Sequence, residues 1–366
     1  MIKPKDLIKK LNKNKINFFT GVPDSILKNL SPYFEKKREN HISAANEGSA
    51  IALATGYYLS TKKVPCVYIQ NSGLGNAINP LASLTHSKVY SIPILLMIGW
   101  RGSPNLNDEP QHEVKGAITR EILKLLGIKF CILRKQQDFN KLEKLIKLSK
   151  LKKIPVACLI EKKTLIKERN NSLFFKKKSD LKRIKVIEEL LKKIKTNTNI
   201  VSTTGFTSRE LMELRKKEKK GNDFYMVGAM GHSAALSLAI SLNSKKQTIC
   251  LDGDGSLIMH LGSLATIGFF GKNNFKHILF NNNAHESVGG QKTNINKINF
   301  QKFIEGIGYR KYIFIKSKKE LNSNLNKFLK SPGPVFMEIN TSQGSIKNLM
   351  RPGNLIKIKN KFMSNV

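Results

Sequence analysis

The chain has 366 residues, of which 40% are hydrophobic and 25% are charged, and this composition excludes a disordered or collagen-like polymer. Its length is that of two ordinary domains or one large α/β unit, and we expect two domains. The formal net charge is +38, but only ten of the 64 basic residues are arginine and the lysines are spread along the chain, so we do not predict dedicated nucleic-acid binding.

Short β-rich runs alternate with helical segments in the first half of the chain. The runs begin at Asn17, His41, Pro65, Ile92, Lys129 and Ile154. Segments such as SILKNLSPYFEKK and GSAIALATGYYLS lie between them. Strands spaced by helices of this length predict βαβ crossovers and a parallel sheet that is covered on both faces. We therefore expect an α/β domain over residues 1–165.

A polar, charged segment without sustained periodicity interrupts this alternation, and we expect residues 166–182 to be a linker. After it, VIEELLKKI predicts a helix, and strands are expected in NIVSTTG, YMVGAMG, TICLDGDG, HILFNNN, YIFIKS and GPVFMEIN. Residues 183–366 should therefore form a second α/β domain. The predicted fold is two tandem, doubly wound parallel sheets, and ligands should bind at the carboxyl ends of the strands.

The cysteines and the apolar segments indicate a cellular compartment. Cys66, Cys131, Cys158 and Cys250 lie far apart in strand-like runs, without metal-binding spacing or a dense disulfide framework. The first residues lack the apolar stretch of a signal peptide, and no apolar run is long enough to span a membrane. We expect buried thiols in a soluble, cytoplasmic protein.

The sharpest motif is TICLDGDGS, which places Gly253, Asp254, Gly255 and Ser256 between a predicted strand and a helical stretch. Glycines let the backbone approach a diphosphate, and a helix N-terminus offers free N–H groups to it. Asp254 offers a hard oxygen ligand of the kind that Mg²⁺ prefers. A Gly-Asp-Gly sequence alone is more often only a tight turn. Asn282, at the end of the next predicted strand, should reach the same sheet edge and complete the coordination.

A GDGS turn followed by an apolar helix, a strand and an Asn-Asn pair at this interval resembles the cofactor motif of thiamine-diphosphate-dependent enzymes. The resemblance implies that Asp254, Asn282 and the backbone carbonyl of Ala284 bind Mg²⁺ beside the diphosphate. It also implies that Met230 of VGAMGH supports the bent cofactor, and that the Gly228 carbonyl accepts a hydrogen bond from its aminopyrimidine. Core packing alone would also explain a methionine after a strand.

Glu47 lies after the short predicted strand HISAA and just before an apolar helix. From the residues alone, a carboxylate at this place favours the helix N-terminus. The resemblance implies a different role, in which Glu47 hydrogen-bonds the pyrimidine ring and promotes the imino form that removes the thiazolium proton. Semi-buried surroundings would raise its pKa, which suits proton exchange with a weakly basic ring nitrogen.

Four further segments, GVPDS, QNSGLGNAINPL, GWRGSPNLNDEPQHE and NNNAHESVGGQKT, resemble more narrowly the phosphonopyruvate decarboxylases and the related sulfopyruvate decarboxylases. The chain also lacks the middle domain of pyruvate decarboxylase and acetolactate synthase. It departs from the subgroup at Asn283, where glycine is expected, and in the C-terminal GSIKNLMRPGN. The resemblance implies decarboxylation of 3-phosphonopyruvate to phosphonoacetaldehyde and CO₂ through a thiamine ylid and an enamine. Sulfopyruvate decarboxylation and a synthase reaction with a second keto acid are the alternatives.

Decarboxylation requires a proton donor, and three side chains are candidates. His112 and His285 lie in predicted polar loops beside acidic neighbours. Asp24 follows the first predicted strand and is equally well explained as a helix cap. We name Asp24 and His112 as the acid/base candidates and place His285 near the substrate.

A dianionic phosphonate also requires a cationic receptor, because charge-assisted hydrogen bonds best fix such a group. Arg101 in GWRG, Lys292 in GGQKT and Arg351 in MRPG are the candidates, although each is also one of many basic residues. The family resemblance places the cofactor between the first domain of one subunit and the second domain of another. It therefore implies a homodimer or a higher homo-oligomer.

Overall fold

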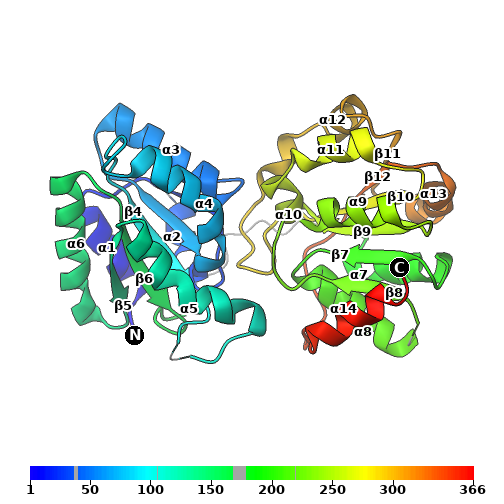
Figure 1. The fold of residues 1–366 in the computed structure, drawn as a ribbon, viewed down its shortest axis with the longest axis horizontal. Helices are drawn as coiled ribbons and strands as arrows, with labels where there is room; N and C mark the ends of the chain where they lie inside the picture. The colour runs from blue at the N-terminus through cyan, green and yellow to red at the C-terminus, as the bar shows by residue number, and fades with distance from the viewer. Residues whose placement is uncertain (37–39, 105, 168–178, 219) are drawn as a thin grey trace. The chain divides into compact units, whose positions relative to one another are not determined.

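The computed structural model describes residues 1–36, 40–104, 106–167, 179–218 and 220–366 (Figure 1). The chain separates into two compact units, residues 1–174 and 175–366, and each unit contains one parallel sheet of six strands. Most of the expected linker, residues 166–182, lies outside the described residues. Its last part packs with the second unit, because the Ser179 hydroxyl donates to the Asn340 carbonyl and Leu181 is buried in that unit's core.

The first unit has the strand order β2-β1-β3-β4-β6-β5. Its strands are β1 (Phe19–Gly21), β2 (His41–Ser43), β3 (Cys66–Gln70), β4 (Leu95–Trp100), β5 (Lys129–Leu133) and β6 (Val156–Glu161). Its helices are α1 (Pro4–Lys13), α2 (Ser31–Glu35), α3 (Glu47–Thr61), α4 (Leu74–Pro80), α5 (Pro110–Leu125) and α6 (Phe139–Lys152).

The central strands β3, β4 and β6 are apolar because both of their faces are covered. Along β4, Leu95 and Met97 face one apolar cluster, whereas Leu96 and Ile98 face a second cluster on the other side. Alternate side chains of a strand point to opposite faces, so burial on both sides removes the polar alternation of a half-exposed strand. The expected doubly covered parallel sheet is therefore confirmed.

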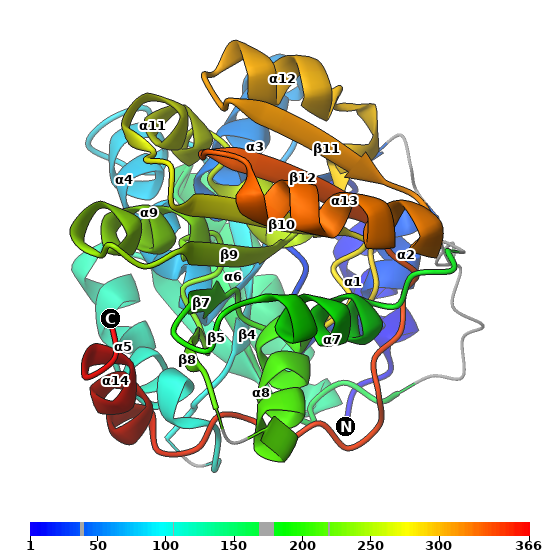
Figure 2. The ribbon, with the colours of Figure 1, turned by 90° about the vertical axis from the view of Figure 1, so that its right-hand side faces the viewer.

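The second unit has the strand order β11-β12-β10-β9-β7-β8, which Figure 2 shows with helices flanking the sheet. Its strands are β7 (Asn199–Ser202), β8 (Asn222–Tyr225), β9 (Thr248–Gly253), β10 (Phe275–Asn281), β11 (Lys311–Ile315) and β12 (Val335–Asn340). Its helices are α7 (Arg183–Lys193), α8 (Phe206–Glu218), α9 (Ser233–Asn243), α10 (Asp254–Met259), α11 (Ser263–Phe270), α12 (Phe300–Gly306), α13 (Lys318–Lys330) and α14 (Leu355–Met363). None of the helices in the described ranges is long and apolar enough to cross a lipid bilayer.

Three local expectations differ from the structure. The YMVGAMG run is mostly a loop, since β8 ends at Tyr225, and Ala229 within the run is left-handed with φ of 49°. The helical stretch after Asp254 is divided into α10 and α11 at His260. His112 lies in the first turn of α5 and not in a loop, since Pro110 starts the helix at its first position.

Candidate active site

The GDGS motif forms the junction between β9 and α10. Asp254 is 3% exposed, and its Oδ1 accepts the Gly255 N–H at 2.8 Å. Its Oδ2 accepts the Ala284 N–H at 3.2 Å and the Thr293 hydroxyl at 3.1 Å. Burial outweighs these hydrogen bonds and raises the pKa of Asp254 to about 7. The carboxylate is thus fixed at the carboxyl end of a central strand.

Asn282 reaches the same place from the neighbouring strand. Strands β9 and β10 are paired so that Gly253 lies opposite Phe280, and Asn282 follows two residues later. Its Oδ1 accepts the Ala284 N–H at 3.0 Å, so the Asp254 and Asn282 oxygens converge on one backbone donor. The Asn282 amide nitrogen donates to Glu286 at 3.0 Å, which fixes the orientation of the amide. Two hard oxygen atoms therefore lie side by side.

The departure at Asn283 has a conformational explanation. Asn283 has φ of 58°, in the left-handed region where glycine is the usual residue. Asparagine tolerates this region better than most other residues. Its side chain also accepts a hydrogen bond from Thr293 at 3.3 Å. The Asn282–Ala284 turn can therefore form without a glycine.

These groups line one pocket of the second unit, formed at the ends of strands β7, β9 and β10. Expected site residues in its wall are Met230, Gly253, Asp254, Gly255, Ser256, Asn282, Ala284 and His285. The loop that carries Met230 is tied to the motif, because the Gly231 N–H donates to the Ser256 hydroxyl oxygen at 3.1 Å. Gly228 is half-buried in the same loop but is not part of the pocket wall. Burial lowers the pKa of His285 to about 4, so its imidazole is neutral near pH 7.

Glu47 is the first residue of α3 in the first unit, behind the cap residue Asn46. It is 4% exposed, and its Oε2 accepts a hydrogen bond from the Asn76 amide at 2.8 Å. Its Oε1 lies against Gly73, where a Cβ atom would be only 1.9 Å away. Burial raises the pKa of Glu47. The sequence analysis did not identify Asn76 or Gly73 as neighbours, although both lie in the QNSGLGNAINPL segment.

Asp24 is buried and has two kinds of partner. Its Oδ2 accepts the N–H groups of Ile26 and Leu27 at 3.0 and 2.9 Å, which is the geometry of a cap before the short turn Leu27–Asn29. Its Oδ1 accepts from the Gln70 amide. Burial nevertheless raises the pKa of Asp24, because desolvation disfavours the carboxylate. Asp24 is therefore both a cap and a buried acid.

Arg101 is held by acidic neighbours. Its Nε donates to Asp108 at 2.6 Å, Nη2 contacts Asp108 and Glu109, and Nη1 donates to Ser25 at 3.2 Å. Burial opposes ionisation of Asp108, but the hydrogen bonds and charge of Arg101 prevail and lower its pKa to about 2. Burial and the charge of Arg101 lower the pKa of His112 to about 4, and its Nδ1 has no partner in the described part of the chain.

The other two expected cations are on the surface. Lys292 is exposed, although its backbone forms a bridge with Ala284. Arg351 is exposed in the segment that precedes α14.

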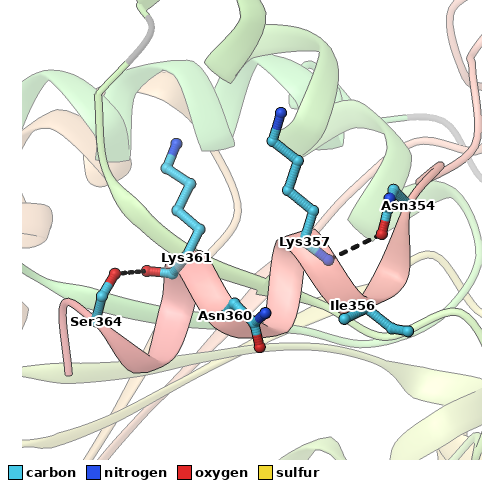
Figure 3. A pocket seen from close by; sticks show the side chains of 6 residues that line it. All are labelled: Asn354, Ile356, Lys357, Asn360, Lys361 and Ser364. Carbon is cyan, nitrogen blue, oxygen red and sulfur yellow. Dashed lines mark hydrogen bonds between the residues drawn. The ribbon is translucent and has the colours of Figure 1, made fainter.

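A second depression lies along α14 and is drawn in Figure 3. It is lined by Asn354, Ile356, Lys357, Asn360, Lys361 and Ser364. All six side chains are exposed and belong to one helix or its caps, where Asn354 accepts the Lys357 N–H at 2.9 Å. None of the sequence-predicted site residues lies there, so the candidate site is the pocket around Asp254.

Comparison with known proteins relates both units to one family. Residues 4–122 match the thiamine pyrophosphate enzyme N-terminal TPP binding domain, and residues 203–339 match the C-terminal TPP binding domain. The chain is 31% identical to the phosphonopyruvate decarboxylase of Streptomyces viridochromogenes, over 96% of this chain and 91% of the relative. The corresponding enzyme of Streptomyces hygroscopicus is 32% identical over 96% and 90%. The sulfopyruvate decarboxylase of Methanosarcina acetivorans is 26% identical over 95% and 91%.

Proposed function

Because the chain belongs to the thiamine-pyrophosphate-dependent enzymes, as a decarboxylase, we propose that it converts 3-phosphonopyruvate to phosphonoacetaldehyde and CO₂. The choice of 3-phosphonopyruvate as the substrate rests on the nearly end-to-end match to two phosphonopyruvate decarboxylases at 31–32% identity. The sulfopyruvate decarboxylase matches a similar share of the chain at 26% identity, so sulfopyruvate is the alternative substrate. A synthase reaction with a second keto acid is a further alternative.

The donor set around Asp254 suits a divalent cation and a diphosphate. We propose that the Asp254 carboxylate, the Asn282 amide oxygen and the Ala284 carbonyl bind Mg²⁺, which prefers such hard oxygen ligands. Gly253, Gly255 and Ser256 would hold the diphosphate, with Met230 and the Gly228 carbonyl supporting the rest of the cofactor. Bound thiamine diphosphate supplies the electron sink for the electron pair of the breaking carbon–carboxylate bond.

The buried carboxylates of the first unit suit proton transfer. We assign to Glu47 the exchange of a proton with the cofactor's pyrimidine, since burial raises its pKa and Asn76 orients its carboxylate. A donor side chain would supply the proton that replaces the lost carboxylate on the reacting carbon. Asp24 suits a donor because burial raises its pKa, whereas His112 has a lowered pKa and is neutral near pH 7. Asp24 is therefore the preferred donor of the two.

The candidate phosphonate receptors are an ion-paired arginine and two exposed cations. Arg101 would have to exchange the Asp108 carboxylate for the phosphonate. Lys292 and Arg351 are exposed cations that could reach a ligand only at the surface. We keep Arg101, Lys292 and His285 as the substrate residues to be tested by substitution.

We further propose a cytoplasmic homodimer or larger homo-oligomer. All four cysteines are free, which suits a reducing compartment. In the single chain, the apolar side chains of Phe269 and Phe270 on α11 are exposed, which suits a surface that another subunit covers. Analytical ultracentrifugation with and without cofactor measures the assembly, and a monomer that retains full turnover would refute it.

Turnover of three keto acids tests the proposed reaction. The kcat/KM values for phosphonopyruvate, sulfopyruvate and pyruvate are measured with thiamine diphosphate and Mg²⁺, and both CO₂ and aldehyde are followed. A preference for phosphonopyruvate is expected. A preference for sulfopyruvate would select the alternative substrate, and CO₂ release without free aldehyde would select the synthase reaction. An enzyme that decarboxylates none of the three refutes the proposal.

A further inference from the structure

Arg183, the first residue of α7, is a buried cation that the sequence analysis did not connect with the site. It is 5% exposed, and its Nε donates to Glu210 at 2.7 Å while Nη1 donates to Glu286 at 3.1 Å. Its Nη2 is buried and has no hydrogen-bond partner among the described residues. A buried donor without an acceptor is unfavourable, because it has lost its contact with water and gained nothing in return. Nη2 is therefore available to donate a hydrogen bond to an acceptor atom of a bound ligand.

Arg183 lies in the wall of the pocket that contains Asp254 and Asn282. It is the one arginine or lysine among the described residues of that wall, whereas Asp254 and Glu286 are acidic. A divalent cation at Asp254 would offset part of this negative charge, and an anionic group would then need a second positive partner. A guanidinium suits such a group because its N–H donors match the oxygens of a phosphate.

Arg183 also connects to the proposed metal ligand through Glu286. The same carboxylate oxygen of Glu286 accepts from Arg183 Nη1 and from the Asn282 amide nitrogen at 3.0 Å. The other Glu286 oxygen accepts the Gly344 N–H. Since the amide nitrogen of Asn282 is held in this way, its oxygen is left facing Ala284. Arg183 and Glu286 therefore fix which end of the Asn282 amide is offered to a metal.

We propose that Arg183 is a cofactor-positioning residue whose Nη2 donates to an anionic oxygen of the thiamine diphosphate. The inference rests on the proposed cofactor and adds an anion contact outside the GDGS and NNN motifs. The phosphonate of the substrate offers the same oxyanion chemistry. Arg183 shares the pocket with Gly253–Ser256 and Asn282, and this placement favours the diphosphate of the cofactor.

Calorimetric titration of the full-length protein with thiamine diphosphate and Mg²⁺ tests this contact without relying on turnover. Arg183→Met should raise the Kd of the cofactor about 10- to 100-fold, because one charge-assisted hydrogen bond is lost. Arg183→Lys should raise it about 10-fold, because an ammonium group cannot serve Glu210, Glu286 and the ligand together. In the same variants the Kd of inorganic diphosphate should rise in parallel with the Kd of the cofactor. The Kd of thiamine without phosphate should be unchanged.

Arg215 provides a matched control in the same unit. It is 9% exposed and also bound by two acidic residues, but all three of its nitrogens are engaged, by Asp223 and Glu218, and it is not in the pocket wall. Arg215→Met should lower the thermal unfolding temperature without changing the cofactor Kd. This control shows whether the loss of a buried ion pair in the same unit, away from the pocket, changes cofactor binding by itself.

The possible failures are distinguishable from one another. A wild-type protein that binds no thiamine diphosphate refutes the proposed function itself. If the wild type binds and folded Arg183→Met binds within threefold of it, the contact is refuted. The contact with the cofactor is also refuted if Arg183→Met leaves the cofactor Kd unchanged but raises the KM for phosphonopyruvate. Arg183 would then bind the phosphonate of the substrate. Should Arg183→Met not fold, folded Arg183→Lys decides by the same threefold limit.

Discussion

A methyl group at Gly73 would occupy space that the Glu47 side chain fills. A Cβ atom there would lie 1.9 Å from Oε1, 2.3 Å from Cδ and 2.6 Å from Cγ of Glu47. An ordinary van der Waals contact begins near 3.4 Å, so in Gly73→Ala the carboxylate must retreat by about 1.5 Å. The carboxylate is the mobile end of a flexible side chain, so the substitution should displace Glu47 more than it destabilises the fold.

The expected effects on activity and stability therefore differ. A displacement of about 1 Å in a reacting group can cost about 100-fold in rate, so kcat/KM should fall by roughly that factor. Loss of the Asn76 hydrogen bond should cost only about 1 kcal/mol of the free energy of unfolding. Steady-state decarboxylation and urea unfolding measure the two quantities on the same preparation.

Gly75→Ala is the matched control, because Gly75 lies two residues away in α4 and a Cβ atom there would meet nothing within 4 Å. It should retain wild-type turnover and stability. The reasoning would be refuted by a Gly73→Ala enzyme whose kcat/KM stays within threefold of the Gly75→Ala enzyme. Catalysis would then not depend on where the Glu47 carboxylate lies.

Three further predictions concern the metal site, Arg101 and the effect of pH. Asp254→Ala removes one proposed ligand and should weaken Mg²⁺-dependent binding of thiamine diphosphate at least about 10-fold by calorimetry; unchanged affinity would remove Asp254 from the metal site. Arg101→Ala removes a proposed phosphonate receptor and should lower kcat/KM for phosphonopyruvate more than for pyruvate; an equal fall for all three keto acids, together with a lower unfolding temperature, would instead show that Arg101 only holds Asp108 and Glu109. Burial lowers the pKa of His41 from 6.5 to about 4, so the unfolded chain takes up the proton first and stability is lost as the pH falls below 6.5. Urea unfolding of the first unit should show a loss of about 2 kcal/mol between pH 7.5 and pH 5 from this group, and a His41→Gln variant with the same pH slope as the wild type would contradict it.

The central sheet strands were predictable because they are largely apolar runs bounded by polar segments. A strand that is buried on both faces needs apolar residues at nearly every position, as in β4, β6 and β10. The error at YMVGAMG arose because the strand β8, Asn222–Tyr225, precedes this apolar run and overlaps it only at Tyr225. Hydrophobicity therefore locates the buried central strands but not a polar edge strand such as β8.

The partners of the site residues were not predictable in the same way. The Arg183–Glu210 pair joins residues 27 apart, and the Arg183–Glu286 pair joins residues 103 apart. Neither pair follows a helix or strand period, so a single sequence gives no local signal for them. For Asp24, only one of its two roles could be predicted from the sequence. The cap is formed with its neighbours in sequence, whereas the raised pKa depends on burial in the folded unit.

Two glycines lie directly against the buried carboxylates of Glu47 and Asp24, a placement that the motifs alone did not predict. Gly73 leaves room for Glu47, and Gly99 leaves room for Asp24, since a Cβ atom at Gly99 would lie 2.0 Å from Asp24 Oδ2. Gly99 is also paired with Gln70, which donates to the same aspartate. Both candidate acid/base carboxylates of the first unit thus lie directly against backbone, in space that no other residue type leaves open. A larger residue at either position would displace the carboxylate, so the site requires a glycine at both places.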